Sequence, residues 1–263
     1  MGRVSVKGPQ VWKTYSNFCL GISLGSQNHD GEALQSIVAW LNANQHKPDP
    51  KNPDQGAGFR QGIIDFSDTL HRYNYMIEGL KIGLSHSDAI MQTMQASDIW
   101  LAKNRATLDK ITIPHTVMHW NRWLMDDRYP EYRDRFQNAY SAGGLFQDTV
   151  HEDVRLYLGR RCKADVDLAK VDPRVLKLSV DFLLEEMAAH SILYEDFPCA
   201  VVYPGRQQKS FKMVRAGLVA DVPTGMQNSH HTRLVLHNMA PMMQPGGAPV
   251  RPGRKTVFMP CVA

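Results

Sequence analysis

Four short apolar runs, partly β-branched, are separated along the chain by segments with the periodicity of amphipathic helices. Runs of this length and composition are typical of buried strands, and their alternation with helical segments indicates a mainly parallel sheet. We therefore predict an α/β fold in which a mainly parallel central sheet is flanked by helices. The predicted strands are residues 17–23, 61–67, 110–118 and 197–203.

Helical periodicity fills most of the chain between these strands. A helix is predicted over 32–45, two more over 74–94 and 97–109, with Ser97 and Asp98 as the start signal of the second, and two long helices within 119–162 around Gly143-Gly144. Pro173 is predicted to open a further helix. Its core-facing stripe comprises Val175, Leu176, Val180, Leu183 and Leu184.

The distribution of proline and glycine along the chain predicts one domain over residues 1–240 and a Pro/Gly-rich tail over 241–263. No internal repeat and no linker divides the first part, and residues 46–62 have the proline and glycine content of a loop. The tail is expected to be poorly ordered unless its apolar end docks. A length of 263 residues is sufficient for one large α/β domain.

Composition narrows the functional classes. No run approaches the roughly 20 apolar residues of a membrane span, and the N-terminus lacks the apolar core of a secretory signal. The four cysteines form neither a CxxC pair nor a Cys/His pair at zinc spacing, so we expect reduced thiols, no metal and a cytoplasmic location. A net charge of +4 permits a nucleic-acid partner without indicating one.

The first predicted strand leads directly into Gly21-Ile22-Ser23-Leu24-Gly25, and a helix follows. Such a junction places Ser23 at the carboxyl edge of a sheet, where α/β proteins build their sites. Taken alone, the pattern is more often a structural turn. It also fits the nucleophile elbow of a serine hydrolase, with His230, His231 or His237 as base. The early position of Ser23 argues against that fold, because about one strand precedes it.

Two later segments add candidate chemistry. In the helix that Pro173 opens, Phe182 and Glu186 are four residues apart and project from one face, while one of Glu185 and Glu186 is expected to be a solvated flank residue. Tyr203 ends the last predicted strand and should lie at the same sheet edge as Ser23. Each feature by itself has a plain packing explanation.

Together these segments resemble the cyclodipeptide synthases over roughly residues 17–215. The resemblance rests on the serine turn, the Phe182-x-x-x-Glu186 helix and Tyr203-Pro204, and it extends to Asp68-Thr69 and Pro130-Glu131-Tyr132. Val154-Arg155 and Arg160-Arg161 match a basic helix of that family. Ser26 and Tyr203-Pro204 resemble the family branch that has a variable residue three positions after the serine.

The resemblance implies a Rossmann-like domain similar to the class Ic aminoacyl-tRNA synthetases. It also implies an enzyme that joins the aminoacyl groups of two aminoacyl-tRNAs into a 2,5-diketopiperazine, with no cofactor and as a monomer. Ser23 would carry the aminoacyl and dipeptidyl groups in turn, Glu186 would hold the substrate ammonium, and Tyr203 would relay a proton. The sequence shows no dedicated histidine base for Ser23.

By the same resemblance, further residues are expected around the substrates. Those expected to bind the aminoacyl groups are Gly21, Gly25, Ser26, Asp65, Asp68, Phe182, Arg160 and Arg161. Those expected to contact tRNA are Lys103, Arg105, Lys110, Arg155 and Lys163. An acidic pocket formed by Asp65, Asp68 and Glu185 would suit a cationic residue such as arginine. The alternative is that they are capping groups, as acidic residues near a strand edge more often are.

The sequence departs from the family pattern in two places. Phe182 stands where the family usually has tyrosine. The basic helix that binds tRNA in some members has few basic residues here. Both departures favour an alternative in which the chain is a synthetase-like domain that binds tRNA without chemistry.

Overall fold

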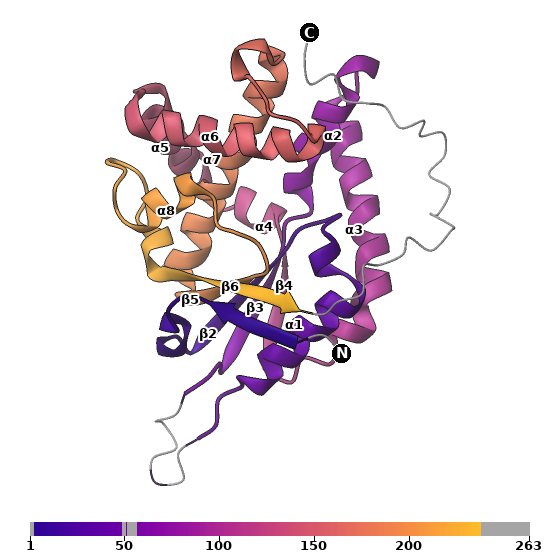
Figure 1. Cartoon of the computed structure of the whole chain (residues 1–263), viewed down its shortest axis with the longest axis vertical. Coiled ribbons are helices and arrows are strands. Elements are labelled where there is room, and N and C mark those ends of the chain that lie inside the picture. Colours follow the sequence, from indigo (N-terminus) through magenta and orange to yellow (C-terminus); the bar gives the residue numbers. More distant parts are fainter. Residues whose placement is uncertain (1–2, 49–50, 52–56, 238–263) are drawn as a thin grey trace.

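The computed structural model describes residues 3–48, 51 and 57–237. Its sheet has six strands in the order β1-β6-β5-β2-β3-β4 (Figure 1). Every neighbouring pair is parallel except β1 and β6, so the predicted mainly parallel sheet is confirmed. The strands are β1 Arg3–Lys7, β2 Asn17–Ile22, β3 Gln61–Phe66, β4 His115–His119, β5 Cys199–Tyr203 and β6 Ser229–His237.

Eight α-helices surround this sheet within the described part of the chain. The four that precede α5 are α1 Gly31–Ala43, α2 Arg72–Gly79, α3 His86–Leu108 and the short α4 Asn121–Leu124. The other four are α5 Tyr129–Ser141, α6 Gly144–Cys162, α7 Pro173–Asp196 and α8 Lys209–Arg215. A 3-10 turn over Thr69–His71 joins the end of β3 to α2.

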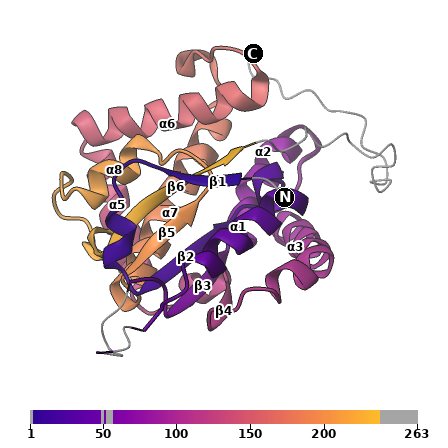
Figure 2. The same cartoon turned by 60° about the horizontal axis from the view of Figure 1, so that its bottom comes forward.

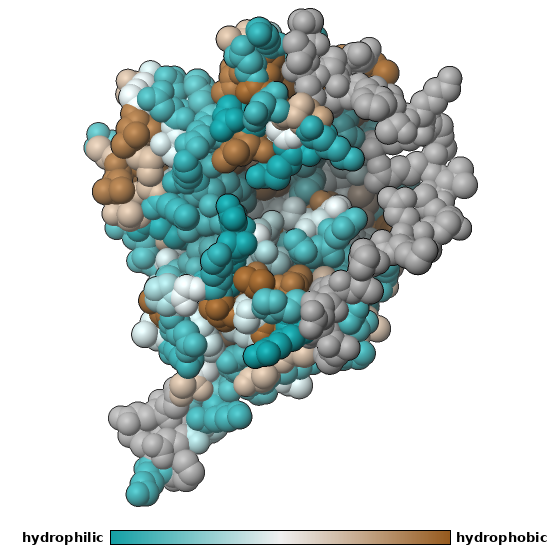
Figure 3. Space-filling view, viewed as in Figure 1, coloured by the Kyte–Doolittle hydropathy of each residue, from teal (hydrophilic) through white to brown (hydrophobic). Residues whose placement is uncertain are grey.

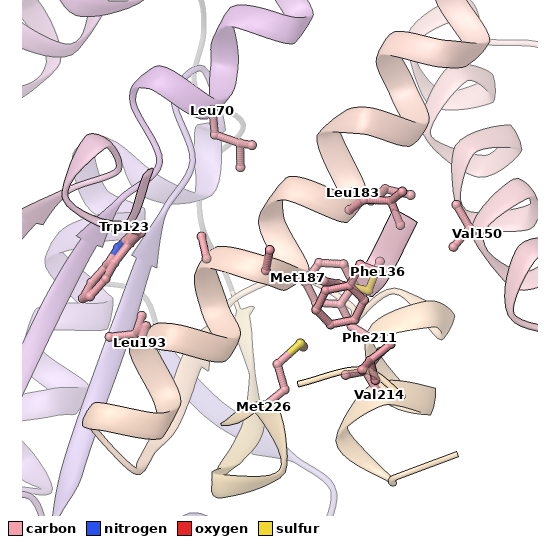
Figure 4. Close-up of a cluster of buried hydrophobic side chains, with 14 of the residues drawn as sticks. Leu70, Trp123, Phe136, Val150, Leu183, Met187, Leu193, Phe211, Val214 and Met226 are labelled. Carbon is pink, nitrogen blue, oxygen red and sulfur yellow. The ribbon is translucent and has the colours of Figure 1, made fainter. Parts of the chain in front are cut away.

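Side chains point alternately to the two faces of the sheet along each strand, and each face packs against a different set of helices. Phe18, Leu20 and Ile22 of β2 belong to a buried cluster with residues of α1 and α3. Cys19, in contrast, belongs to a larger cluster with residues of α5, α6, α7 and α8. Figure 2 shows these two helical layers on opposite sides of the sheet, and Figure 4 shows part of the larger cluster around α7. The protein is therefore a three-layer α/β domain.

The long helix α7 follows the sequence pattern closely. Pro173 occupies its first turn, and the side chain of Asp172 caps it by accepting a hydrogen bond from the Arg174 N–H. Val180 and Leu183 are buried against the larger cluster, as the predicted stripe requires. This helix therefore packs as predicted, and it carries Glu186 into the interior of the domain.

Other elements differ from the predictions for identifiable reasons. The predicted break at Ser97 is wrong because Ser97 is buried within α3, whereas the side chain of Ser85 caps the helix by accepting from the Asp88 N–H. The predicted strand 110–118 begins later, at His115. β1, β6 and α8 were not predicted from the sequence pattern. Much of the predicted loop 46–62 and all of the tail 241–263 lie outside the described residues.

The cysteines also differ in part from expectation. Cys19 and Cys199 are buried free thiols. Cys162, at the end of α6, is disulfide-bonded, so the prediction of reduced thiols is wrong at that position.

The strand order places β2 beside β5 at the point where the direction of winding reverses. The chain passes from β2 to β3 and β4 on one side, then crosses back to β5 on the other. Leu20 of β2 pairs with Val202 of β5, so the carboxyl ends of these two strands lie side by side. Such switch points form crevices in which α/β proteins bind ligands. Ser23 and Tyr203 both lie at this one.

The surface is mostly hydrophilic on the face shown in Figure 3, where hydrophobic residues form separate patches. Within the described ranges, no helix is both long and apolar enough to span a membrane.

Asp153 of α6 provides the N-terminal cap of α8 and should be important for stability. Its buried carboxylate accepts hydrogen bonds from the backbone N–H groups of Lys209 and Ser210 and from the Ser210 hydroxyl, at 3.0, 2.8 and 2.7 Å. Asp153→Asn should lower the free energy of unfolding by about 1–3 kcal/mol, because an amide nitrogen would face these donors.

Urea denaturation measures this loss, and Glu152→Gln is the matched control. Glu152 is a more exposed neighbour that pairs with Lys209, so its loss should cost about 0–1 kcal/mol. Equal effects of the two substitutions would contradict the capping role of Asp153.

Candidate active site

Ser23 lies in the turn that leaves β2 at the switch point. Gly25 has a φ of +76°, a left-handed conformation that favours glycine, and the Ser26 N–H donates to the Ser23 carbonyl at 3.3 Å. The predicted strand, turn and helix are thus confirmed, and the hydroxyl of Ser23 points toward groups from other elements.

His29, in the 3-10 turn that precedes α1, fixes the backbone of the serine turn. The Ser23 N–H donates to His29 Nδ1 at 2.9 Å, and the indole of Trp100 donates to the His29 carbonyl at 3.1 Å. Burial lowers the pKa of His29 to about 4. The imidazole is therefore neutral, and its ring packs edge-on against Tyr203 at 5.2 Å between centroids.

His71 contacts the hydroxyl of Ser23, with 3.2 Å between His71 Nε2 and Ser23 Oγ. The sequence pattern did not indicate this imidazole as a neighbour of Ser23. The histidines considered for a hydrolase lie elsewhere. His231 Nε2 is 3.2 Å from the Gly205 carbonyl, and His237 is 2.7 Å from the hydroxyl of Ser5. The geometry therefore brings a different imidazole to Ser23 from those that the sequence suggested.

Tyr203 ends β5 beside Ser23. Burial and the nearby Glu186 raise the pKa of Tyr203 to about 12, while a hydrogen bond with Ser23 and the charge of Arg160 oppose that rise. A Cβ on Gly205 would stand 2.4 Å from the tyrosine ring, so the glycine leaves room for it. Tyr203 is therefore a neutral phenol held next to the serine hydroxyl.

Glu186 has a partly buried side chain, and one of its two carboxylate oxygens lacks a protein partner. Its Oε2 atom has no solvent-accessible surface and accepts no hydrogen bond. Burial raises its pKa to about 7, and His190 and Asp65 act on it in opposite directions. A buried acceptor left without a donor costs free energy. The site therefore offers an unused acceptor that a cationic ligand would satisfy.

Glu185, in contrast, is fully engaged by the protein. Arg72 of α2 binds both of its carboxylate oxygens, and the side chains of Tyr73, Trp120 and Tyr129 donate to it as well. Only 1% of Glu185 is exposed. Glu185 is therefore not a solvated flank residue, whereas Glu186 is partly exposed.

The other two carboxylates of the predicted acidic pocket also have protein partners. Asp65 accepts from the Trp123 indole at 3.0 Å and lies 3.2 Å from His190 Nε2. Asp68 accepts from the backbone N–H groups of Thr69 and Trp120 and lies 2.6 Å from His119 Nδ1. Asp68 thus joins the end of β3 to the end of β4, and Asp65 joins β3 to α4 and α7, so these carboxylates offer little free charge to an arginine side chain.

Phe182 lies one helical turn from Glu186 and faces two tyrosines. Its ring is 6.2 Å from that of Tyr73 and stacks at 6.3 Å on that of Tyr157. Arg161 donates to the Tyr157 hydroxyl at 2.9 Å and forms an ion pair with Glu78. Arg160 is exposed and close enough to lower the pKa of Tyr203. The basic end of α6 therefore borders the site.

The residues predicted to contact tRNA fall into two groups. Arg155 is partly buried on α6 and pairs with Asp165, whereas Lys163 is exposed just beyond the end of this helix, near Arg160. Lys103 and Arg105 are exposed on α3, where Lys103 pairs with Asp30 at the start of α1. Lys110 is beside the other end of α1, because its carbonyl accepts from Asn42. The structure therefore places Lys110 away from Ser23.

Sequence reasoning missed His29 and His71. Both lie in short 3-10 turns at the carboxyl ends of β2 and β3, which are neighbouring parallel strands. The position of His71 three residues after Asp68 was the available signal. Within the described residues, no group of three or more His, Cys, Asp or Glu side chains has the arrangement of a metal site.

No family model and no curated protein matches this sequence. Solved structures do match. A CDPS from Fluoribacter dumoffii has 21% identity and a TM-score of 0.72 over 91% of this chain and 100% of that one. A cyclodipeptide synthase from Candidatus Glomeribacter gigasporarum, solved bound to Phe-tRNAPhe, has 16% identity and a TM-score of 0.62, over 89% of this chain and 93% of that one.

A third structure, from Mycobacterium tuberculosis, has 13% identity and a TM-score of 0.61 over 88% of this chain and 92% of that one. Its description relates cyclodipeptide synthetases to type I tRNA synthetases. The chain has the cyclodipeptide synthase fold. The fold expected from the sequence resemblance is thus confirmed across about nine tenths of the chain.

Within the cyclodipeptide synthase fold, the buried pair of Arg72 and Glu185 should be a major source of stability. Glu185→Gln leaves the Arg72 charge buried without its counterion, so the free energy of unfolding should fall by about 3–5 kcal/mol. Chemical denaturation measures the loss. Glu195→Gln on the same helix is the control, since its side chain is 44% exposed. A Glu185→Gln effect no larger than that of the control would contradict this role.

Replacing Glu186 should raise the stability of the protein rather than lower it, and the gain should depend on pH. Its pKa is about 7 in the folded protein against an ordinary value of 4.5. The folded state therefore binds this proton more tightly than the unfolded state, and stability is lost as pH rises through this window. Glu186→Gln should melt close to the wild type at pH 4.5 and progressively above it towards pH 8. A constant difference in melting temperature across that range would contradict the raised pKa.

Proposed function

We propose that this protein is a tRNA-dependent cyclodipeptide synthase. The observation that carries the proposal is the meeting of Ser23, Tyr203 and the unpartnered carboxylate of Glu186 at the switch point of this fold. In that role the enzyme would join two aminoacyl groups, delivered by aminoacyl-tRNAs, into a 2,5-diketopiperazine. An aminoacyl ester is already activated, so the reaction needs a nucleophile and positioning rather than ATP.

The first step would form an aminoacyl-enzyme on Ser23. Its Oγ attacks the ester carbonyl, the bond from that carbon to the ribose oxygen breaks, and the first tRNA leaves. The hydroxyl proton of Ser23 ends on the ribose oxygen. The position of Ser23 in an open turn after β2, with a glycine at +76° two residues later, supports this role because the hydroxyl is presented at the sheet edge.

Glu186 would hold the ammonium group of the bound aminoacyl unit. A buried carboxylate of pKa about 7 is close to the ordinary pKa of an α-amino group, about 8, so a proton can pass between them at little cost. The ammonium would also supply the donor that Oε2 lacks. Phe182, which cannot bond to the ammonium, would provide the apolar wall one turn away.

Tyr203 would act when the ring closes. The second aminoacyl-tRNA supplies an amine that takes the first aminoacyl group from Ser23, and the resulting dipeptide is passed to the same serine. The free amine then attacks the dipeptidyl ester, its C–Oγ bond breaks, and Tyr203 relays the amine proton to Oγ. A phenol with a pKa near 12 keeps its proton at neutral pH, which suits a relay rather than a base.

The exposed arginines and lysine at the end of α6 would meet the phosphates of the tRNA acceptor end. Arg160 and Lys163 are exposed there and Arg155 is partly exposed, and phosphate contacts make such binding largely independent of sequence. The solved relative bound to Phe-tRNAPhe supports a tRNA partner for this fold. A domain that binds tRNA without chemistry would have no need for a buried glutamate oxygen that lacks a donor.

Replacing Ser23 should abolish product and leave the fold intact. The purified protein is incubated with a mixture of aminoacyl-tRNAs, and diketopiperazines are sought by mass spectrometry. The wild type should form a cyclic dipeptide, and Ser23→Ala should form none with an unchanged melting temperature. Ser16→Ala, an exposed serine just before the opposite end of β2, is the control and should keep full activity. Undiminished product from Ser23→Ala would overturn the proposed mechanism.

A further inference from the structure

His71 belongs to a chain of polar contacts that runs from the nucleophile to the end of α6. Its Nε2 lies 3.2 Å from Ser23 Oγ, and its Nδ1 lies 3.1 Å from the side-chain nitrogen of Asn74. The Tyr157 hydroxyl donates to Asn74 Oδ1, and Arg161 donates to that hydroxyl at 2.9 Å. The proposed function uses none of His71, Asn74 and Tyr157.

The direction of these bonds determines which imidazole nitrogen carries the proton. Arg161 has only donors, so the Tyr157 oxygen accepts from it and the phenol proton is free to reach Asn74 Oδ1. That contact orients the Asn74 amide, whose NH2 group then donates to His71 Nδ1. A nitrogen that accepts carries no proton in a neutral ring. The proton of His71 therefore resides on Nε2, facing Ser23.

We propose that His71 is a catalytic residue that donates a fixed hydrogen bond from Nε2–H to Ser23 Oγ, held in this tautomer by Asn74, Tyr157 and Arg161. In this arrangement His71 stabilises negative charge on Oγ and never removes its proton. The arrangement is the reverse of a serine protease triad, in which a carboxylate accepts from the far nitrogen and the near nitrogen is the base. The inference rests on the proposed function of Ser23 as nucleophile.

A donor aimed at Oγ would act twice in the reaction. In acylation the Oγ–C bond forms as the bond from carbon to the ribose oxygen breaks, and the serine proton ends on the ribose. In ring closure the N–C bond forms, the C–Oγ bond breaks, and an amine proton ends on Oγ. Negative charge develops on Oγ near both transition states. A preorganised donor lowers both barriers while His71 keeps its own proton.

The surroundings of His71 keep its imidazole neutral. Burial lowers its pKa to about 4, and the charge of Arg161 from α6 acts in the same direction. Tyr157 also reaches it from α6 through Asn74. Across Ser23, Glu186 of α7, Tyr203 of β5 and the more distant Arg160 complete the titratable groups. Of these, Glu186 is the group expected to titrate near neutral pH.

The test measures how fast Ser23 reacts with a fluorophosphonate, which needs no tRNA. Its Oγ displaces fluoride from phosphorus, and the serine proton leaves with the fluoride. His71→Leu should label about 10²–10³-fold more slowly than the wild type, the range found for loss of one oxyanion donor. His71→Gln, whose amide can still donate, should recover part of that rate. Unchanged labelling in His71→Leu, or a wild type that does not label, would overturn the proposal.

Asn74→Asp tests the tautomer, because a carboxylate would accept from Nδ1–H and turn Nε2 into an acceptor. In this variant the imidazole becomes a base, so its labelling rate should fall at low pH as the imidazole is protonated. The wild-type labelling rate should show no such fall that depends on His71. Asn138→Asp on α5 is the matched control. Nitrogen NMR of the wild type should place the proton on Nε2. A proton on Nδ1, or identical pH profiles for Asn74→Asp and the wild type, would overturn the proposal.

These readouts separate the inference from the proposed function. If the wild type makes no diketopiperazine but Ser23 labelling depends on His71 as described, the proposed function fails and the role of His71 stands. If product forms and labelling is independent of His71, the proposed function stands and the role of His71 fails.

Discussion

The buried ion pair between Arg72 and Glu185 is the interaction on which the rest of the site depends. Arg72 directly follows His71, and Glu185 directly precedes Glu186, so one bidentate contact sets the position of both functional neighbours. Tyr73 adds a donor from the same helix as Arg72, and Trp120 and Tyr129 add donors from two further segments. A charge this deeply buried is tolerated only when it is fully paired. Two adjacent glutamates of α7 therefore have opposite roles, one satisfied by the protein and the other left for a ligand.

The sheet supplies the second constraint, because parallel strands bring distant parts of the sequence to one edge. Ser23 follows β2, His71 follows its neighbour β3, and Tyr203 ends β5 on the other side. Helix α7 then crosses this edge and adds Glu186, while the end of α6 adds Arg160 and Arg161. Each group is held by regular structure or by a capped turn. The site therefore needs little reorganisation to meet a substrate, which is the condition for positional and electrostatic catalysis.

The sequence predicted the parallel strands, the long helix α7 and the serine turn, since all three depend on local pattern and on glycine or proline geometry. It missed β1 and β6, which form an edge pair across the whole length of the chain. It misjudged Ser97, because burial within α3 depends on tertiary packing. The sequence also did not predict the roles of Glu185 and His71. Their partners lie 113 and 48 residues away, and local periodicity does not record such contacts.

The most direct test of the account is to look for the covalent aminoacyl group on the protein. The wild type is mixed with one radiolabelled aminoacyl-tRNA, quenched in acid and digested, and the labelled peptide is mapped by mass spectrometry. The account predicts an aminoacyl ester on Ser23 that a second aminoacyl-tRNA discharges as a cyclic dipeptide. Cyclic dipeptide formation with no label on Ser23, or with the label on another residue, would contradict it.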